Sequence, residues 1–130
     1  MATIMVVDDY PITQRILTYQ LFKEGHQVVT ASNGQEALNS LNELDVNLMI
    51  MDLTMPEMDG ITVLYQLRAC SRHANTPVII LTASNKDQDR KQALRAGANA
   101  FLTKPADNWQ LFNIIDELLV DFAPMELAVG

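Results

Sequence analysis

The sequence predicts an α/β fold in which a parallel sheet carries helices on both faces. Five short apolar runs have strand length, at residues 3–7, 26–31, 47–51, 77–82 and 99–103. Three of these runs are too continuously apolar to be exposed on either face, as is typical of buried parallel strands. Helical patterns separate the runs, and this alternation favours parallel pairing through right-handed connections.

The clearest helical pattern lies near the end of the chain, where one apolar stripe recurs at three- and four-residue spacing: Leu111, Ile114, Ile115, Leu118, Leu119 and Phe122. This stripe predicts a helix that packs one face on the sheet. Trp109, near its start, is expected to be structural.

Residues at the expected helix boundaries agree with this alternation. Pro11 suits a first helical turn, and Asp59 is a natural N-cap. Ser32 and Gln35 have the spacing of a capping box, and Gly97 predicts a helix end.

The 130 residues fit one domain, which we place at residues 1–120, with residues 121–130 as a tail or the start of a linker because Pro124 would break the helix. The net charge of −7 argues against general affinity for nucleic acid or anionic membranes. The single cysteine cannot pair within the chain, and no apolar run approaches the length of a membrane span. We therefore expect a cytoplasmic protein without direct nucleic-acid or membrane contacts.

Polar residues follow four of the predicted strands. Asp8 and Asp9 end the first run, Asp52 the third and Thr82 the fourth, and Lys104 follows the fifth. Ligands bind outside the carboxyl ends of such strands, so these groups should meet at one edge of the sheet. Three carboxylates and one ammonium leave excess negative charge, which favours a further hard cation such as Mg²⁺.

Asp52 is the best candidate nucleophile, because a carboxylate can accept a phosphoryl group and Asp52 stands alone at its strand end. Lys104 and the Thr82 hydroxyl can each bind a phosphoryl oxygen. Taken singly, each residue has an ordinary explanation, and Asp9 could simply cap the following helix. The functional interpretation depends on their convergence.

Four segments carry a family resemblance: VVDD at 6–9, MDLTMPEMDG at 51–60, ILTA at 80–83 and LTKP at 102–105. In order and spacing they resemble the receiver domain of two-component response regulators, of the chemotaxis-regulator type, over about residues 3–120. The resemblance implies a flavodoxin-like sheet with strand order 2-1-3-4-5. It also implies that a histidine kinase or histidine phosphotransfer protein phosphorylates Asp52.

The same resemblance implies ligands for Mg²⁺, or another divalent cation such as Mn²⁺: Asp8, Asp9, Asp52 and the backbone carbonyl of Thr54. It implies a cis bond between Lys104 and Pro105. The output would be an attached effector domain or a protein partner, with a possible homodimer through the fourth helix, fifth strand and fifth helix.

In this family Thr82 and the aromatic residue three before the lysine, here Phe101, form a switch that reshapes the partner surface. Phe101 departs from the tyrosine often found at this position. Ala83 leaves room for a phosphoryl group, although a chance alanine explains it nearly as well. Thr54 and Ser84 border the expected path of hydrolytic water.

Three other functions compete with this interpretation. A phosphatase of the haloacid dehalogenase type needs a second acid two residues after the nucleophile, where this chain has Thr54, so we expect no separate turnover substrate. A binding module that has lost phosphorylation would be expected to have lost some of the acidic set. A flavodoxin needs a phosphate loop where this chain has DDYP.

Overall fold

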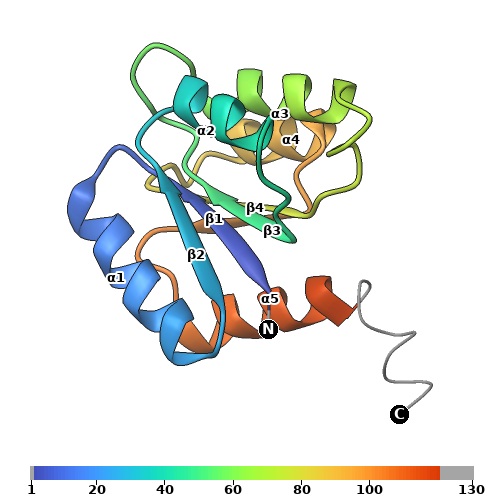
Figure 1. Cartoon of the computed structure of the whole chain (residues 1–130). Coiled ribbons are helices and arrows are strands. Elements are labelled where there is room, and N and C mark those ends of the chain that lie inside the picture. Colours follow the sequence, from blue (N-terminus) through green and yellow to red (C-terminus); the bar gives the residue numbers. More distant parts are fainter. Residues whose placement is uncertain (1, 121–130) are drawn as a thin grey trace.

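The computed structural model describes residues 2–120, as five strands that alternate with five helices (Figure 1). The strands are β1 (Thr3–Val7), β2 (Gln27–Ala31), β3 (Leu48–Met51), β4 (Val78–Thr82) and β5 (Ala100–Thr103). The helices are α1 (Pro11–Lys23), α2 (Gly34–Leu41), α3 (Gly60–Ala69), α4 (Asp87–Ala96) and α5 (Asn108–Val120). The tail predicted at 121–130 and the stripe residue Phe122 lie outside the described residues.

All neighbouring strands are parallel, as the sequence predicts, and their order β2-β1-β3-β4-β5 is the one that the family resemblance implies. Helices α1 and α5 cover one face of the sheet, and α2, α3 and α4 cover the other (Figure 1). Strands β3 and β4 are buried along their whole length, which explains their continuously apolar sequences. Among residues 2–120, no helix has both the length and the apolar character to cross a bilayer.

Four of the predicted strands begin one residue later than expected, because a residue at each start has another role. Pro77 has no N–H to donate to a neighbouring strand. Asn47 Oδ1 accepts a hydrogen bond from Thr3 N at 2.9 Å, and Asn99 Oδ1 accepts one from Val78 N at 2.8 Å. His26 Nδ1 likewise accepts from Ala2 N at 3.3 Å. These side chains close the amino-terminal edge of the sheet.

Most of the predicted helix boundaries are confirmed. Pro11 opens α1, Asp59 accepts a hydrogen bond from Thr62 N at 2.9 Å, and Gly97 ends α4 in the left-handed region with φ 114°. The expected capping box of Ser32 with Gln35 is wrong by one residue: Asn33 caps α2, and Glu36 Oε1 accepts from Ser32 N.

The exposed surface of α1 and of the start of α5 is unusually apolar. Ile16 is 51% exposed, Tyr19 64%, Phe22 72% and Trp109 76%. The expected structural role of Trp109 is therefore wrong, because its ring lies on the surface rather than in a core. Only two residues of α1 carry charge, Arg15 and Lys23, and both are basic.

One arginine organises the end of the molecule that is remote from the strand carboxyl ends. Arg68 donates to five oxygens: the carbonyls of His73, Ala74, Thr76 and Gly97, and Oδ1 of Asn99. Burial lowers the pKa of its guanidinium, since all of these partners are uncharged. Arg68 thus fastens the loop after α3 and the turn after α4 to one side chain.

Candidate functional site

The register of the sheet brings the two most buried acids together. Val7 of β1 pairs with Met51 of β3. The residues that follow these two strands, Asp8 and Asp52, therefore lie at the same edge of the sheet. Asp8 is 3% exposed and Asp52 is 8% exposed. Two carboxylates desolvated side by side require positive charge nearby.

Lys104 supplies part of that charge. Its Nζ lies 2.7 Å from Asp8 Oδ2 and 3.1 Å from Asp52 Oδ2. Partial burial lowers the pKa of Lys104, but the hydrogen bonds to Asp8 and Asp52, with their negative charges, raise it by more, so the net pKa is above its usual value. The bond to Pro105, whose ring is exposed, is cis, as expected.

Asp9 completes a group of three acids whose carboxylate oxygens lie near one another. One carboxylate oxygen each from Asp8, Asp9 and Asp52 can be chosen so that all three lie within 4.8 Å of one another. Ligands of an octahedral Mg²⁺ at about 2.1 Å are separated by at most about 4.2 Å, so small side-chain adjustments would fit the ion. Asp9 is exposed and does not cap α1, because the N-cap residue is Tyr10.

Thr82 ends β4 beside this group but makes no hydrogen bond to a carboxylate among the described residues. Thr82 is 1% exposed, and its Oγ1 accepts a long hydrogen bond of 3.5 Å from Ser84 N. The half-buried Ser84 Oγ donates to Asp89 in the first turn of α4, and Thr103 Oγ1 donates to Ser84 O at 3.2 Å. Ala83 is exposed. The loop after β4 is therefore tied to both α4 and β5.

Phe101 and Thr54 occupy different settings. Phe101 is half-buried and packs on the core under α2, α3 and α4. It pairs with Ile80 in the sheet, and Thr82 follows Ile80 by two residues, so Thr82 and Phe101 face the same side of the sheet.

Thr54 lies in the loop after β3. It is exposed, and its N–H donates to Asp52 Oδ1 at 3.1 Å.

Two residues that support the site carry no sequence signal strong enough to predict them. Gly60, at the start of α3, lies so close to the Asp52 loop that a Cβ would stand 2.7 Å from the Asp52 carbonyl oxygen. Gln14 of α1 donates from its side-chain amide to the Asp8 carbonyl oxygen. Both depend on close approaches between segments that are distant in the sequence.

Comparison with known proteins agrees with this geometry. The response regulator receiver domain family matches residues 4–116. The chain belongs to this family. It is therefore a receiver domain of two-component response regulators, a class of phosphoacceptors rather than of metabolic enzymes.

Three relatives illustrate the range of receiver proteins. The chain is 41% identical to transcriptional regulatory protein GlrR of Escherichia coli, over 95% of this chain and 27% of GlrR. It is 35% identical to protein PilH of Pseudomonas aeruginosa, over 92% of this chain and 98% of PilH. A structure of response regulator TrrA from Thermotoga maritima with Mg²⁺-BeF superposes with a TM-score of 0.82, at 30% identity over 92% and 100% of the two chains.

Proposed function

We propose that Asp52 accepts a phosphoryl group from a histidine kinase or histidine phosphotransfer protein and thereby switches a protein-binding surface. The observation that carries this proposal is the contact of one lysine with both buried acids, Asp8 and Asp52. Charge neutralisation and positioning are what phosphoryl transfer requires of a protein. Thr54 stands where a phosphatase of the haloacid dehalogenase type has its second acid, so no separate substrate is turned over.

The transfer step is a displacement at phosphorus. A carboxylate oxygen of Asp52 forms the new O–P bond while the P–N bond to the donor imidazole breaks, and the released nitrogen keeps the electron pair and takes a proton from solvent. Lys104 then binds a phosphoryl oxygen. Among the described residues the hydroxyl of Thr82 has only a long hydrogen bond, from Ser84 N, and we expect it to turn toward the phosphoryl group.

A divalent cation, Mg²⁺ or Mn²⁺, would be held by Asp8, Asp9, Asp52 and the backbone carbonyl of Thr54. Bound there, it would supply positive charge to the transferring phosphoryl oxygens. The fit of the three acids within 4.8 Å supports this assignment, and TrrA was crystallised with Mg²⁺-BeF. The accessory positions are assigned by resemblance: Ala83 leaves room, Ser84 borders the water path and Pro105 follows the lysine.

The experiment that tests this proposal is the intact mass of the protein after incubation with Mg²⁺ and acetyl phosphate. We expect one added phosphoryl group, removable by hydroxylamine, and none when EDTA removes the metal. If rapid hydrolysis hides the adduct, beryllium fluoride with Mg²⁺ should still bind and change the amide spectrum around Asp52. Absence of both effects would contradict the proposal.

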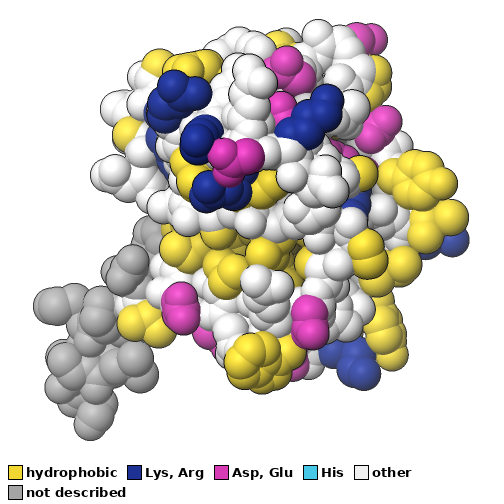
Figure 2. All heavy atoms as spheres, turned by 180° about the vertical axis from the view of Figure 1, so that it is seen from behind, with side chains coloured by type: hydrophobic (Ala, Val, Ile, Leu, Met, Phe, Trp, Pro, Cys, Tyr) yellow, Lys and Arg dark blue, Asp and Glu magenta, His cyan; other side chains and the backbone are white. Residues whose placement is uncertain are grey.

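The output surface is the face made by α4, β5 and α5. Figure 2 looks onto the β5 side of the molecule, where Lys and Arg side chains gather above a belt of hydrophobic side chains. Lys86, Arg90, Lys91 and Arg95 are exposed on or beside α4. Movement of Thr82 leaves space that Phe101 can enter, which would reshape this face for an output protein, an attached effector domain or a second copy.

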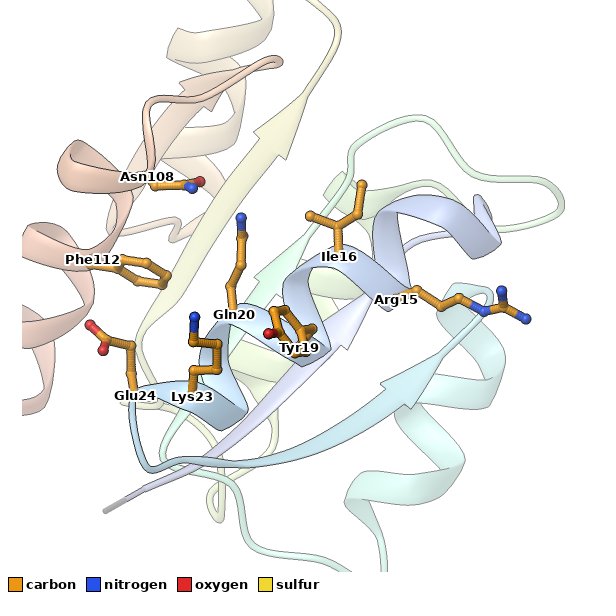
Figure 3. A pocket seen from close by; sticks show the side chains of 8 residues that line it. All are labelled: Arg15, Ile16, Tyr19, Gln20, Lys23, Glu24, Asn108 and Phe112. Atoms are coloured by element: carbon orange, nitrogen blue, oxygen red, sulfur yellow. The ribbon is translucent and has the colours of Figure 1, made fainter.

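The donor protein docks on α1. A donor histidine must reach Asp52 from beyond the strand ends, and α1 begins there, directly after Tyr10. A contiguous exposed apolar patch, such as the one on α1, is typical of a surface that contacts another protein. A groove of about 570 Å³ between α1 and α5 adds a recess lined by Ile16, Tyr19 and Phe112 (Figure 3).

Changing Tyr19 to glutamate should reduce phosphorylation by the protein donor without affecting the site. We expect the phosphorylated fraction in cells that carry this protein to fall by about tenfold, the effect of losing one interface contact of about 1.4 kcal/mol. Phosphate-affinity electrophoresis measures this fraction. The reaction of purified Tyr19→Glu with acetyl phosphate should match the wild type.

The matched control is Tyr65→Glu, because Tyr65 lies on α3 and is 58% exposed, close to the 64% of Tyr19. Equal loss of phosphorylation in both variants would contradict donor docking on α1.

A further inference from the structure

The side chain of Gln14 makes hydrogen bonds at the carboxyl ends of β1 and β2, beside the proposed cation site. No sequence pattern predicts these contacts. Gln14 is the fourth residue of α1, and its Nε2 lies 3.2 Å from Ala31 O and 3.2 Å from Ser32 Oγ. It is closer still to Asp8 O. One amide thus joins the end of β1 to the end of β2.

The Asp8 carbonyl has a special position, because it belongs to the peptide bond that links Asp8 to Asp9. The orientation of this peptide therefore affects the direction in which each of the two carboxylates projects. The other polar atoms of Asp8 have partners too: N donates to Ala31 O at 3.0 Å, and Oδ1 accepts from Tyr10 N at 2.9 Å. Gln14 completes the restraint by holding the carbonyl oxygen.

The chemistry of the amide suits this place. Gln14 is neutral, so it donates hydrogen bonds without reducing the negative charge that attracts the cation. A lysine there would repel the metal, and a glutamate would face three oxygens with no hydrogen to donate. A leucine would leave the Asp8 carbonyl without its side-chain donor.

We propose that Gln14 is a positioning residue for the divalent-cation site, which presets the angle between the Asp8 and Asp9 carboxylates. The inference rests on the proposed cation site of these acids. Groups that hold metal ligands from behind typically contribute tenfold or more to metal affinity. Gln14 acts through the peptide and touches neither the cation nor the phosphoryl group.

The test is Mn²⁺ and Mg²⁺ affinity, measured by calorimetry on the full chain without any phosphoryl donor. We expect Gln14→Leu and Gln14→Met each to weaken binding by about tenfold. The matched control is Gln20→Leu, the same change on the same helix, since the Gln20 side chain borders the α1–α5 groove instead. Gln20→Leu should bind like the wild type.

The outcomes separate the possible failures. A wild-type protein that binds neither ion overturns the proposed cation site itself. Wild-type binding with unchanged affinity in both Gln14 variants overturns the role of Gln14 alone. A lower melting temperature of the metal-free Gln14 variants with unchanged affinity assigns Gln14 a purely structural role, which also overturns the proposal.

A second measurement needs no substitution and so does not depend on folding of the variants. In ¹⁵N spectra of the wild type, the side-chain amide of Gln14 should exchange slowly with solvent and shift when Mg²⁺ is added. The side-chain amide of Gln20 should do neither. The proposal would be contradicted if Mg²⁺ changed the chemical shift of the Asp9 backbone amide but not that of the Gln14 side-chain amide.

Discussion

Replacing Asp52 with asparagine is expected to abolish phosphorylation. The amide has nearly the shape of the carboxylate but no nucleophilic oxygen anion, so no O–P bond forms. Intact mass after incubation with Mg²⁺ and acetyl phosphate should show no added phosphoryl group. The fold should persist, because the substitution removes one of three mutually repelling carboxylates and keeps a hydrogen-bond acceptor for Thr54 N.

The control for this variant is Asp116→Asn, the same change at an exposed acid of α5. It should gain the phosphoryl group as the wild type does. Peptide mapping of the wild type after borohydride reduction should place the modification on Asp52. A stable phosphoryl group on Asp9 or Asp59 of the Asp52→Asn protein would show that the acceptor had been assigned to the wrong carboxylate.

Replacing Lys104 with methionine should move phosphorylation and metal binding in opposite directions. The variant loses the cation that binds a phosphoryl oxygen, which should slow phosphorylation by about a hundredfold. It also loses the positive charge that competes with a metal ion for Asp8 and Asp52, so Mg²⁺ should bind more tightly than to the wild type. Stopped-flow phosphorylation and calorimetry measure the two effects.

The same variant should be less stable without metal. The side chains of Asp8 and Asp52 are only 4% and 10% exposed. Removing the partner of such buried charges lowers the free energy of unfolding by about 3 kcal/mol. Mg²⁺ should restore much of this loss in denaturant titrations, because it binds only the folded state. Lys86→Met, at an exposed position before α4, should behave as the wild type. Weaker Mg²⁺ binding by Lys104→Met would contradict this account of the charges.

The strand-end rule explains why the centre of the site could be predicted from sequence. Asp8, Asp52 and Lys104 each follow an apolar strand, and parallel pairing places such residues at one edge whatever the details of packing. Thr82 shows the limit of the rule. It arrives at the edge as expected, yet the direction of its hydroxyl depends on the loop that follows.

Other features depend on distances that no local pattern encodes. Ser32 with Gln35 and Asn33 with Glu36 are both acceptable caps for α2, and only the packed structure selects the second pair. Gly60 is recognisable as necessary only once α3 lies against Asp52. The exposed apolar face of α1 could not be predicted from the sequence. Apolar residues occur on all sides of this helix, so the sequence does not indicate which side faces solvent.

Helix α4 is held at both of its ends, at one of them by Arg68. Its last turn is held at Gly97, whose carbonyl accepts from the guanidinium at 2.7 Å, whereas its first turn is joined through Asp89 and Ser84 to the loop after Thr82. If Thr82 moves on phosphorylation as proposed, the loop after it would carry this movement to the first turn of α4. A partner that contacts α4 near Lys86 would then be affected more than one that contacts it near Arg95.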